Sequence, residues 1–411
     1  MELRPRGLDR IEALIAKGAT IPNPWTVDLD DDVDIDRISG DGVVIHPGCR
    51  IRGSRTVISA GCRLGAETPM TIDNCQLGPG VELAGGFAQG AVFLAGASMA
   101  SGAHVRPGTI LEEQASGAHT VGLKQTILFP FVTLGSLINF CDLLMAGGTS
   151  RHDHSEVGSS YIHFNFTPDG DKTTASLFGD VAHGVLLDRP PIFLGGQGGT
   201  VGPVSAGFGT VVGAGSVLRD DVVEDGQLVL PPAPREVHRP VTPASYRRLP
   251  RILARNVTYV ANLSALESWY RQIRRLFLTR EEFGPQILAG ALVNLEDIRA
   301  ERIKRLRALV GRLRPTDEGR AQLIDRLDDL TEALEVVDGP APAEVVRTMG
   351  AAAGEGVGYL DAVHALRTDL RGEVTQWLSG IVTTQQQNVA DVLPVLLTKG
   401  DDAPFADSVA G

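Results

Sequence analysis

The chain has 411 residues, enough for two or three domains and a sizeable core, and its 38 Lys and Arg against 50 Asp and Glu give a formal net charge of -12. An acidic protein repels phosphate backbones, so the composition argues against a nucleic-acid partner. No apolar run is long enough to cross a bilayer, so no membrane partner is expected. The four cysteines form no CxxC pair, which favours reduced, packed thiols and a cytoplasmic protein.

Residues 1–41 are predicted to be an amphipathic helix followed by an acidic lead-in. The helix ends at Gly18 and carries charged residues where a signal peptide needs an uninterrupted apolar segment. The lead-in from Asp28 resembles a calcium-binding loop, but it has Val33 where that loop needs Gly and Ser39 where it needs Glu. A solvated acidic edge is the favoured interpretation.

Residues 42–230 have the sequence pattern of a hexapeptide repeat. Aliphatic residues recur at a spacing of six, beginning with Ile45 and Ile51, and aliphatic-Gly pairs such as Leu64-Gly65 punctuate the segment. In such a repeat each side of a triangular coil points one aliphatic side chain inward, and small residues turn the corners. The pattern predicts a left-handed parallel β-helix of about ten coils. It weakens over 85–103 and 147–199, where loops are expected to leave the solenoid.

The remaining chain is predicted to be helical. A Pro-rich linker over 231–243 precedes an α-helical domain over 244–400 and a flexible tail over 401–411. Apolar residues from Tyr259 onward recur with the period of a helix. The Arg residues of the helices between Arg247 and Arg314 are interpreted as lying on the wet, solvent-exposed faces of a bundle. The domain could be an oligomerisation element or a cap on the open end of the solenoid.

Most residues suited to chemistry lie between Gly147 and Val217. This stretch has four histidines, an Asn before an aromatic residue and an isolated Lys, in the order His152, His154, His163, Asn165, Phe166, Lys172 and His183. An imidazole titrates near neutrality and can act as a general base, and fixed cations hold phosphate groups. We therefore expect any active site here.

Several of these residues lie in segments that resemble the motifs of a known protein family. The segments 105–108, 117–119, 154–158, 165–174 and 212–217 together resemble the left-handed β-helix acetyltransferase domain of the bifunctional bacterial N-acetylglucosamine-1-phosphate uridyltransferase / glucosamine-1-phosphate acetyltransferase. The similarity covers about residues 100–225. The roughly forty residues before the solenoid are too few for the Rossmann-like uridyltransferase domain, so pyrophosphorylase activity is not expected.

The resemblance implies an acetyltransferase site and its residues. His154 would be the general base, with Asn165 as its catalytic companion, and Phe166 stands where the family has Tyr. The substrate-binding candidates are Arg106, Lys124, Lys172, His163 and Phe166, with the cations on the phosphate. The candidates for acetyl-CoA, the expected co-substrate, are Gly213, Ala214, Arg219 and Arg235. The family also implies a homotrimer with its active site between neighbouring solenoids.

Two departures from the family leave alternatives open: Phe166 replaces its Tyr, and the spacing from Arg106 to the His differs from the family's. Aligning the sequences by length places residues 139–142, beginning with Asn139, where the base belongs. The first function hypothesis is an acyl-CoA-dependent N-acyltransferase acting on an amino-sugar phosphate or nucleotide sugar. The second is a non-catalytic sugar-nucleotide-binding or scaffold protein. A third, weaker alternative is a zinc site of the carbonic-anhydrase type built from His152, His154, His163 and His183.

Overall fold

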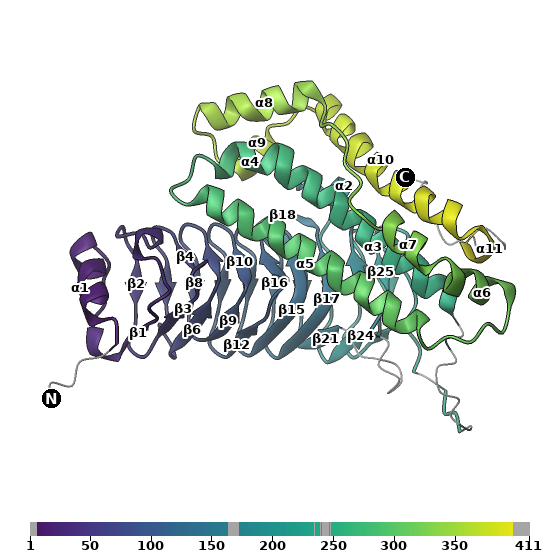
Figure 1. The fold of residues 1–411 in the computed structure, drawn as a ribbon, viewed down its shortest axis with the longest axis horizontal. Helices are drawn as coiled ribbons and strands as arrows, with labels where there is room; N and C mark the ends of the chain where they lie inside the picture. Colours follow the sequence, from purple (N-terminus) through teal and green to yellow (C-terminus); the bar gives the residue numbers. More distant parts are fainter. Residues whose placement is uncertain are drawn as a thin grey trace.

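The computed structural model describes residues 6–162, 172–233, 235–238, 240, 246 and 248–397. A parallel β-solenoid is followed by a helical region, which confirms the predicted fold class (Figure 1). Strands of successive coils pair in parallel, and each coil contributes one strand to each of three faces. The handedness of the coils stays a prediction from the repeat.

The three faces are defined by their strands. The first face contains β1 (Asp28–Leu29), β3 (Arg50–Arg52), β6 (Met70–Asp73), β9 (Gly86–Gln89), β12 (Ala103–Val105), β21 (Ser160–Ile162), β24 (Gly198–Thr200) and β27 (Val217–Leu218). The second face contains β4 (Val57–Ile58), β7 (Gln76–Leu77), β10 (Ala91–Phe93), β13 (Thr109–Leu111), β22 (Ser176–Phe178) and β25 (Ser205–Ala206). The long strands β15 (Val121–Leu128) and β17 (Ile138–Met145) run through both of these faces.

The third face is the ten-stranded ladder on the remaining side. Its strands are β2 (Val44–Ile45), β5 (Arg63–Leu64), β8 (Glu82–Leu83), β11 (Ser98–Met99), β14 (Ser116–Gly117), β16 (Thr133–Leu134), β20 (Glu156–Val157), β23 (Phe193–Leu194), β26 (Val211–Val212) and β28 (Leu228–Val229). Between the second and third faces, a hairpin of β18 (Gly148–Ser150) and β19 (Asp153–His154) leaves the coil.

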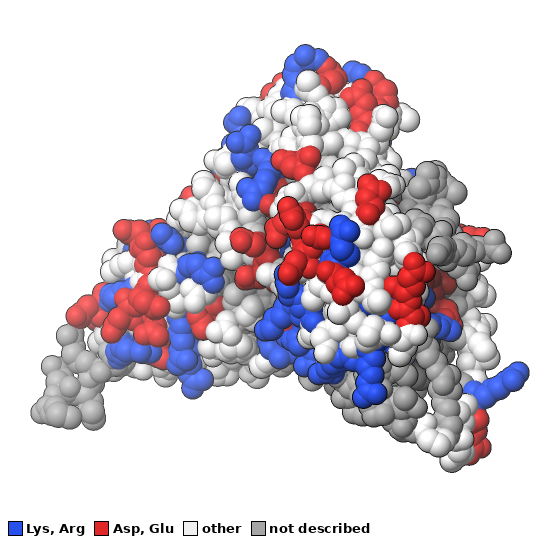
Figure 2. All heavy atoms as spheres, turned by 45° about the vertical axis from the view of Figure 1, so that its right-hand side comes forward, with Lys and Arg blue, Asp and Glu red and all other residues white. Residues whose placement is uncertain are grey.

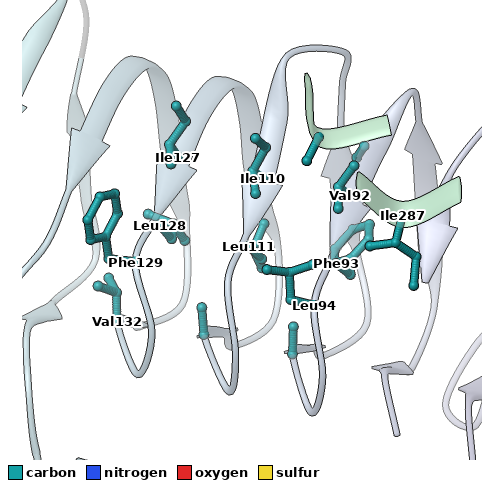
Figure 3. Packing of buried hydrophobic residues seen from close by; sticks show 14 of the residues in the cluster. Val92, Phe93, Leu94, Ile110, Leu111, Ile127, Leu128, Phe129, Val132 and Ile287 are labelled. Carbon is teal, nitrogen blue, oxygen red and sulfur yellow. The ribbon is translucent and has the colours of Figure 1, made fainter. Parts of the chain in front are cut away.

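One inward side chain from each strand builds the solenoid core. On the second face these residues stack in the order Leu77, Phe93, Leu111 and Leu128, and all are fully buried. Figure 3 shows Phe93, Leu111 and Leu128 beside the next column, Val92, Ile110 and Ile127. This repetition is the physical basis of the hexapeptide spacing, because each coil buries its aliphatic residues only against the coils beside it.

The first coil begins earlier than residue 42. Thr20 pairs with Val44, and β1 pairs with β3, so the acidic lead-in is itself part of the solenoid. Two short 3-10 helices, η1 (Pro24–Thr26) and η2 (Ile35–Arg37), lie within it. The helix α1 (Leu8–Lys17) lies at this end of the solenoid, with Leu8, Ile11 and Leu14 buried (Figure 1). It ends at Gly18 as predicted, where a φ of 119° suits a residue without a side chain.

The predicted interruptions were half correct. No loop leaves the solenoid over 85–103, where β9, β10 and β11 continue the ladders; small residues had weakened the repeat there without breaking it. The second interruption is confirmed, because the β18–β19 hairpin and the short helix α2 (Val181–Gly184) both leave the coils between residues 147 and 199. Pairing of Glu156 with Phe193 makes that coil about twice as long as its neighbours.

The helical region lies along the second face and does not merely cap the end of the solenoid (Figure 1). Its inner layer comprises α3 (Leu249–Trp269), the π-helical segment η3 (Tyr270–Arg274), α4 (Arg275–Leu278) and α5 (Gly284–Val310). The other helices are α6 (Glu318–Asp325), α7 (Leu327–Ala333), α8 (Ala343–Gly354), α9 (Tyr359–His364), α10 (Thr368–Val392) and α11 (Pro394–Leu397). The inner helices and the solenoid share one continuous hydrophobic cluster.

The predicted linker lies only partly within the described residues. The described residues between 231 and 240 contain neither helix nor strand, and the tail over 401–411 lies outside the described residues. None of the helices in the described part of the chain combines the length and the apolar character needed to span a bilayer.

Candidate functional site

Two of the predicted phosphate ligands lie side by side on the first face. The Arg106 amide donates to the Leu123 carbonyl at 2.8 Å, and Lys124 pairs directly with Cys141 on the next coil. Arg106, Lys124 and Cys141 therefore occupy one outward column on three successive coils, about 4.8 Å apart per step. We call these three residues the cation strip. The register of a parallel ladder, rather than their spacing in the sequence, brings them together.

The Cys141 thiol reports on the charges around it. Burial raises the pKa of this thiol above its ordinary value, and the neighbouring Asp142 carboxylate raises it further. Arg106 and Lys124 act in the opposite direction, and Arg106 also donates a hydrogen bond to the thiol. Cys141 is only partly buried, whereas Cys49, Cys62 and Cys75 are fully buried. The strip therefore combines two cations with the most accessible of the four thiols.

A buried ion pair from the helical region lies directly beside the strip. Arg302 of α5 donates to the Asp142 Oδ1 atom at 2.6 Å, and both side chains are almost fully buried. The Thr174 hydroxyl donates to the Asp142 Oδ2 atom at 3.1 Å, and Arg302 donates to the Lys172 carbonyl at 3.3 Å. The structure thus brings the main chain of Lys172, a third predicted cation, next to the strip, with its side chain exposed.

His154, the predicted base, lies elsewhere on the same chain. It ends the β18–β19 hairpin, where it pairs with Gly148, and the Arg151 guanidinium holds this hairpin to the carbonyls of Gln114 and Phe131. The His154 Nδ1 atom is buried and has no hydrogen-bond partner among the described residues. Gly148 has a φ of 99°, and a side chain on it would meet the His154 Cα at 2.5 Å.

The second face separates His154 from the cation strip. The chain from Cys141 through the end of β17 to Ala146 crosses that face, which corresponds to roughly 15 Å at the usual rise of a strand. The helices cover this face, so the two groups lie on opposite sides of a packed interface. Asn139, at the start of the alternative base region, is exposed on the first face instead, one coil from the Lys124 strand.

The candidate metal ligands are not assembled among the described residues. His152 is exposed, and the His183 Nδ1 atom is hydrogen-bonded to the Asp180 carboxylate at 2.8 Å. Within the described ranges, no group of three or more His, Cys, Asp or Glu side chains is placed to hold a metal ion. His163, Asn165 and Phe166 lie outside the described residues, so their predicted roles stay predictions.

The predicted coenzyme residues lie towards the other end of the solenoid. Gly213 and Ala214 turn the corner after β26, where a side chain on the stacked Gly195 would meet the Ala214 amide at 2.3 Å. Arg219 follows β27 on the first face, where its guanidinium donates to the Val217 carbonyl at 3.2 Å. Arg235 is exposed. These residues form no compact cluster with the cation strip.

The interpretation of the Arg-rich helices as wet faces was wrong at three positions. Arg274, Arg299 and Arg302 are buried and form ion pairs with Glu113, Glu267 and Asp142. Helical periodicity places an Arg on one side of a helix, but it does not show that a carboxylate from another element of the fold lies on that side. Sequence reasoning therefore missed Arg302 as a neighbour of the site, whereas the alignment by length had already placed residues 139–142, and with them Cys141 and Asp142, in the region of the base. Only the near-regular spacing of Arg106, Lys124 and Cys141 could have indicated that the first two share a column with the third.

Charge on the surface is locally uneven. Figure 2 shows acidic and basic side chains interspersed on the side that it draws, with Lys and Arg gathered in the lower middle of the view. The net charge of -12 therefore does not prevent local binding of an anion. Small phosphorylated ligands remain chemically compatible with the molecule.

Fold and site together define a parallel β-solenoid protein with a helical flank and a two-cation strip. No family model matches the chain. It is 35% identical over 205 residues to the bifunctional protein GlmU of Mycobacterium avium (strain 104), a match that covers 50% of this chain and 37% of that protein. The bifunctional protein GlmU of Nitratidesulfovibrio vulgaris (strain DP4) is 30% identical over 136 residues, covering 33% of this chain and 26% of the relative. The chain thus matches between 26% and 37% of the length of these curated relatives.

Proposed function

We propose that the chain is an acyl-CoA-dependent N-acyltransferase acting on an amino-sugar phosphate or a nucleotide sugar. The observation that supports it best is the pairing of Arg106 and Lys124 on adjacent coils of an exposed face. Two cations on neighbouring strands, which lie about 4.8 Å apart, can contact different oxygens of one phosphate group. The similarity to GlmU over half of the chain agrees with this proposal.

The reaction assigns a role to each candidate. His154 takes a proton from the sugar ammonium, because only the free amine attacks the thioester carbonyl. Asn165 donates to the oxyanion of the tetrahedral intermediate, which forms the amide when its C–S bond breaks and coenzyme A leaves as the thiolate. Arg106, Lys124 and Lys172 hold the phosphate, while His163 and Phe166 contact the sugar. Gly213 and Ala214 leave room for acetyl-CoA along the corner, and Arg219 and Arg235 bind the phosphates of the coenzyme.

The separation of His154 from the cation strip supports an oligomeric site. Because the covered second face lies between them, the base of one copy and the strip of a neighbouring copy have to form the site together. A homotrimer would provide this groove. The third face offers an apolar surface to a neighbour, since Phe193, Val211 and Leu228 follow one another on its ladder and are 39%, 38% and 70% exposed.

Calorimetric titration with glucosamine-1-phosphate tests the cation strip. We expect Lys124→Met to weaken binding about tenfold or more, because a charge-assisted hydrogen bond to phosphate is lost. Arg63→Met is the matched control, since Arg63 is an exposed cation on the third face. Equal affinities in wild type and Lys124→Met would contradict the proposed phosphate site.

The separated base also favours a second function, a non-catalytic sugar-nucleotide-binding or scaffold protein. A transfer assay with acetyl-CoA distinguishes the two, with the molar mass in solution measured on the same sample. The enzyme should be oligomeric, and His154→Ala should abolish turnover while leaving acetyl-CoA binding intact. Binding of UDP-N-acetylglucosamine without acetyl-CoA binding or turnover would favour the scaffold.

A further inference from the structure

The buried pair of Arg302 and Asp142 connects the helical region to the cation strip. Asp142 follows Cys141 in β17, so its carboxylate lies one residue from the strip. The exposed fractions of the Arg302 and Asp142 side chains are 1% and 5%, and their closest atoms are 2.6 Å apart. Such a pair is only weakly screened by solvent or salt, because water cannot enter between the charges.

The two nitrogens of the Arg302 fork contact two different segments. One contacts the Asp142 carboxylate and the other contacts the Lys172 carbonyl. The planar guanidinium can do this with fixed geometry, whereas a lysine ammonium is a single point charge. Asn256 of α3 adds a second anchor, because its amide donates to the carbonyl of Thr173, the residue after Lys172. The helical region therefore holds the chain immediately behind the strip at two neighbouring positions.

Without Arg302, the Asp142 carboxylate would lose the guanidinium that pairs with it at 2.6 Å, and more of its negative charge would act on Lys124 and Arg106. It would attract both cations and repel an anionic ligand. The carboxylate already acts on the neighbouring thiol, because it raises the pKa of Cys141 while Arg106 and Lys124 lower it. The sign of the local field therefore depends on which charges near Cys141 are balanced.

We propose that Arg302 is a positioning residue that keeps the cation strip positive by neutralising Asp142, and that the C-terminal helices are thereby part of the anion site. Arg302 contacts no ligand itself and acts through Asp142 and the Lys172 main chain. The proposal rests on the proposed function as far as the identity of the anion is concerned. The local field, however, is a property that can be measured without that ligand.

Cys141 provides the measurement. A thiolate attacks a disulfide reagent, forms a mixed disulfide and releases the reagent's other half as a thiol. The rate with the anionic dithiobis(nitrobenzoate) depends on the local field, whereas the rate with neutral dithiodipyridine depends mainly on access and thiolate fraction. The ratio of the two rates therefore reports the field. Cys141→Ser identifies the signal, since the other three cysteines are fully buried.

The decisive variants should shift this ratio in opposite directions. Arg302→Met is expected to lower it, and Asp142→Asn is expected to raise it, each roughly three- to tenfold, as expected for one charge within a few ångströms at a partly screened site. A merely structural loosening would speed both reagents in both variants and leave the ratio unchanged. If Arg302→Met does not fold, Asp142→Asn tests the proposal alone, because the Asn oxygen can still accept from Arg302.

Arg299→Met is the matched control. Arg299 lies on the same helix and forms a buried ion pair with Glu267 of α3, within the helical region. It should lose thermal stability much as Arg302→Met does, and it should keep the wild-type ratio. A wild-type ratio in Asp142→Asn, or an equal ratio in Arg302→Met and Arg299→Met, would overturn the proposal.

Binding of glucosamine-1-phosphate to the same variants separates this inference from the proposed function. Arg302→Met should weaken that binding, and Asp142→Asn should preserve or strengthen it. If the wild type does not bind glucosamine-1-phosphate, the proposed function fails, while the opposite shifts of the thiol ratio still support the role of Arg302. If the wild type binds it and the ratios do not move, only the inference about Arg302 fails.

Discussion

The first and second faces of the solenoid share the same inward pattern and differ in their outward residues. Val105 and Leu111, on one coil, are both fully buried inward residues. The neighbouring outward positions differ, because His104 is exposed on the first face and Ile110 is fully buried on the second. Along the next coils the first face continues with Gly122 and Asn139, and the second continues with Ile127 and Leu144.

This difference shows that the inward and the outward columns of side chains have different roles. The inward column builds the solenoid, whichever face it belongs to. The outward column decides whether a face is covered, since each buried aliphatic side chain contributes about 1.5–3 kcal/mol to the packing of the helices. The Gln76 side chain belongs to the outward column of the second face and lies against Gly290 of α5, which identifies that column as the contact surface. The first face keeps polar residues and remains available to a ligand.

Truncating one outward residue on each face tests whether only the second face is covered. We expect Ile110→Ala to lower the free energy of unfolding by about 2–4 kcal/mol, because it leaves a cavity under α5. Asn139→Ala should change it by about 0.5 kcal/mol or less, because the side chain is exposed. Urea unfolding of both variants measures the two effects. Similar losses would mean that the first face is also covered.

Two buried carboxyl groups, Glu112 and Glu113, follow β13 on the second face and depart from its apolar pattern. Glu112 accepts a hydrogen bond from the Tyr270 hydroxyl at 2.5 Å, and Glu113 pairs with Arg274 at 2.8 Å. Both partners belong to the π-helical segment η3, a geometry that often marks a constrained site. Burial raises the pKa of Glu112 to about 7, with Arg274 opposing the shift and Glu113 adding to it. Glu112 therefore keeps its proton at a pH where an unfolded chain has lost it.

The raised pKa of Glu112 makes the stability of the covered second face depend on pH. Because the folded pKa is about 7 against 4.5 in the unfolded chain, the stability contribution is complete below about pH 4.5 and is lost as the pH rises through about 7. Glu112→Gln should match wild type at low pH and become more stable than wild type by roughly 2–3 kcal/mol at pH 8. Thermal unfolding of both proteins between pH 5 and 8 (about one-unit steps) measures the difference. A difference that does not grow with pH would show that Glu112 is ionised in the folded protein.

The hexapeptide pattern predicted the solenoid because the inward column is local in sequence. Ile45 and Ile51 reveal it, since each coil repeats the same burial over a short stretch of chain. The covering of the second face was not predictable in the same way. Ile110 and Ile127 differ from His104 and Asn139 only in hydrophobicity, and the partner of that apolar column is α5, almost two hundred residues away.

The candidate site shows the same limit. The family resemblance identified Arg106 and Lys124 as separate candidates for the phosphate, and both lie on neighbouring coils that are close in sequence. Asp142 and Arg302 could not be proposed as a pair, since an ion pair across 160 residues leaves no periodic signal in either segment. The separation of His154 from the strip was also hidden, because sequence distance does not show that a covered face lies between them.

The smallest effect concerns a single hydrogen bond across the covered face. The Gly108 amide donates to the Asn294 side-chain oxygen of α5 at 2.8 Å, and the bond is buried. We expect Asn294→Ala to lower the free energy of unfolding by about 1–2 kcal/mol, because the amide loses its acceptor where water cannot replace it. Gln89→Ala is the control on the first face, where the Gln89 amide donates to Asp73 at 2.9 Å on a partly exposed surface. Water can take over that bond, so the loss should stay below about 0.5 kcal/mol. Equal losses in urea unfolding would contradict this expectation. They would mean that water reaches the Gly108 amide beneath α5 as easily as it reaches Gln89 on the first face.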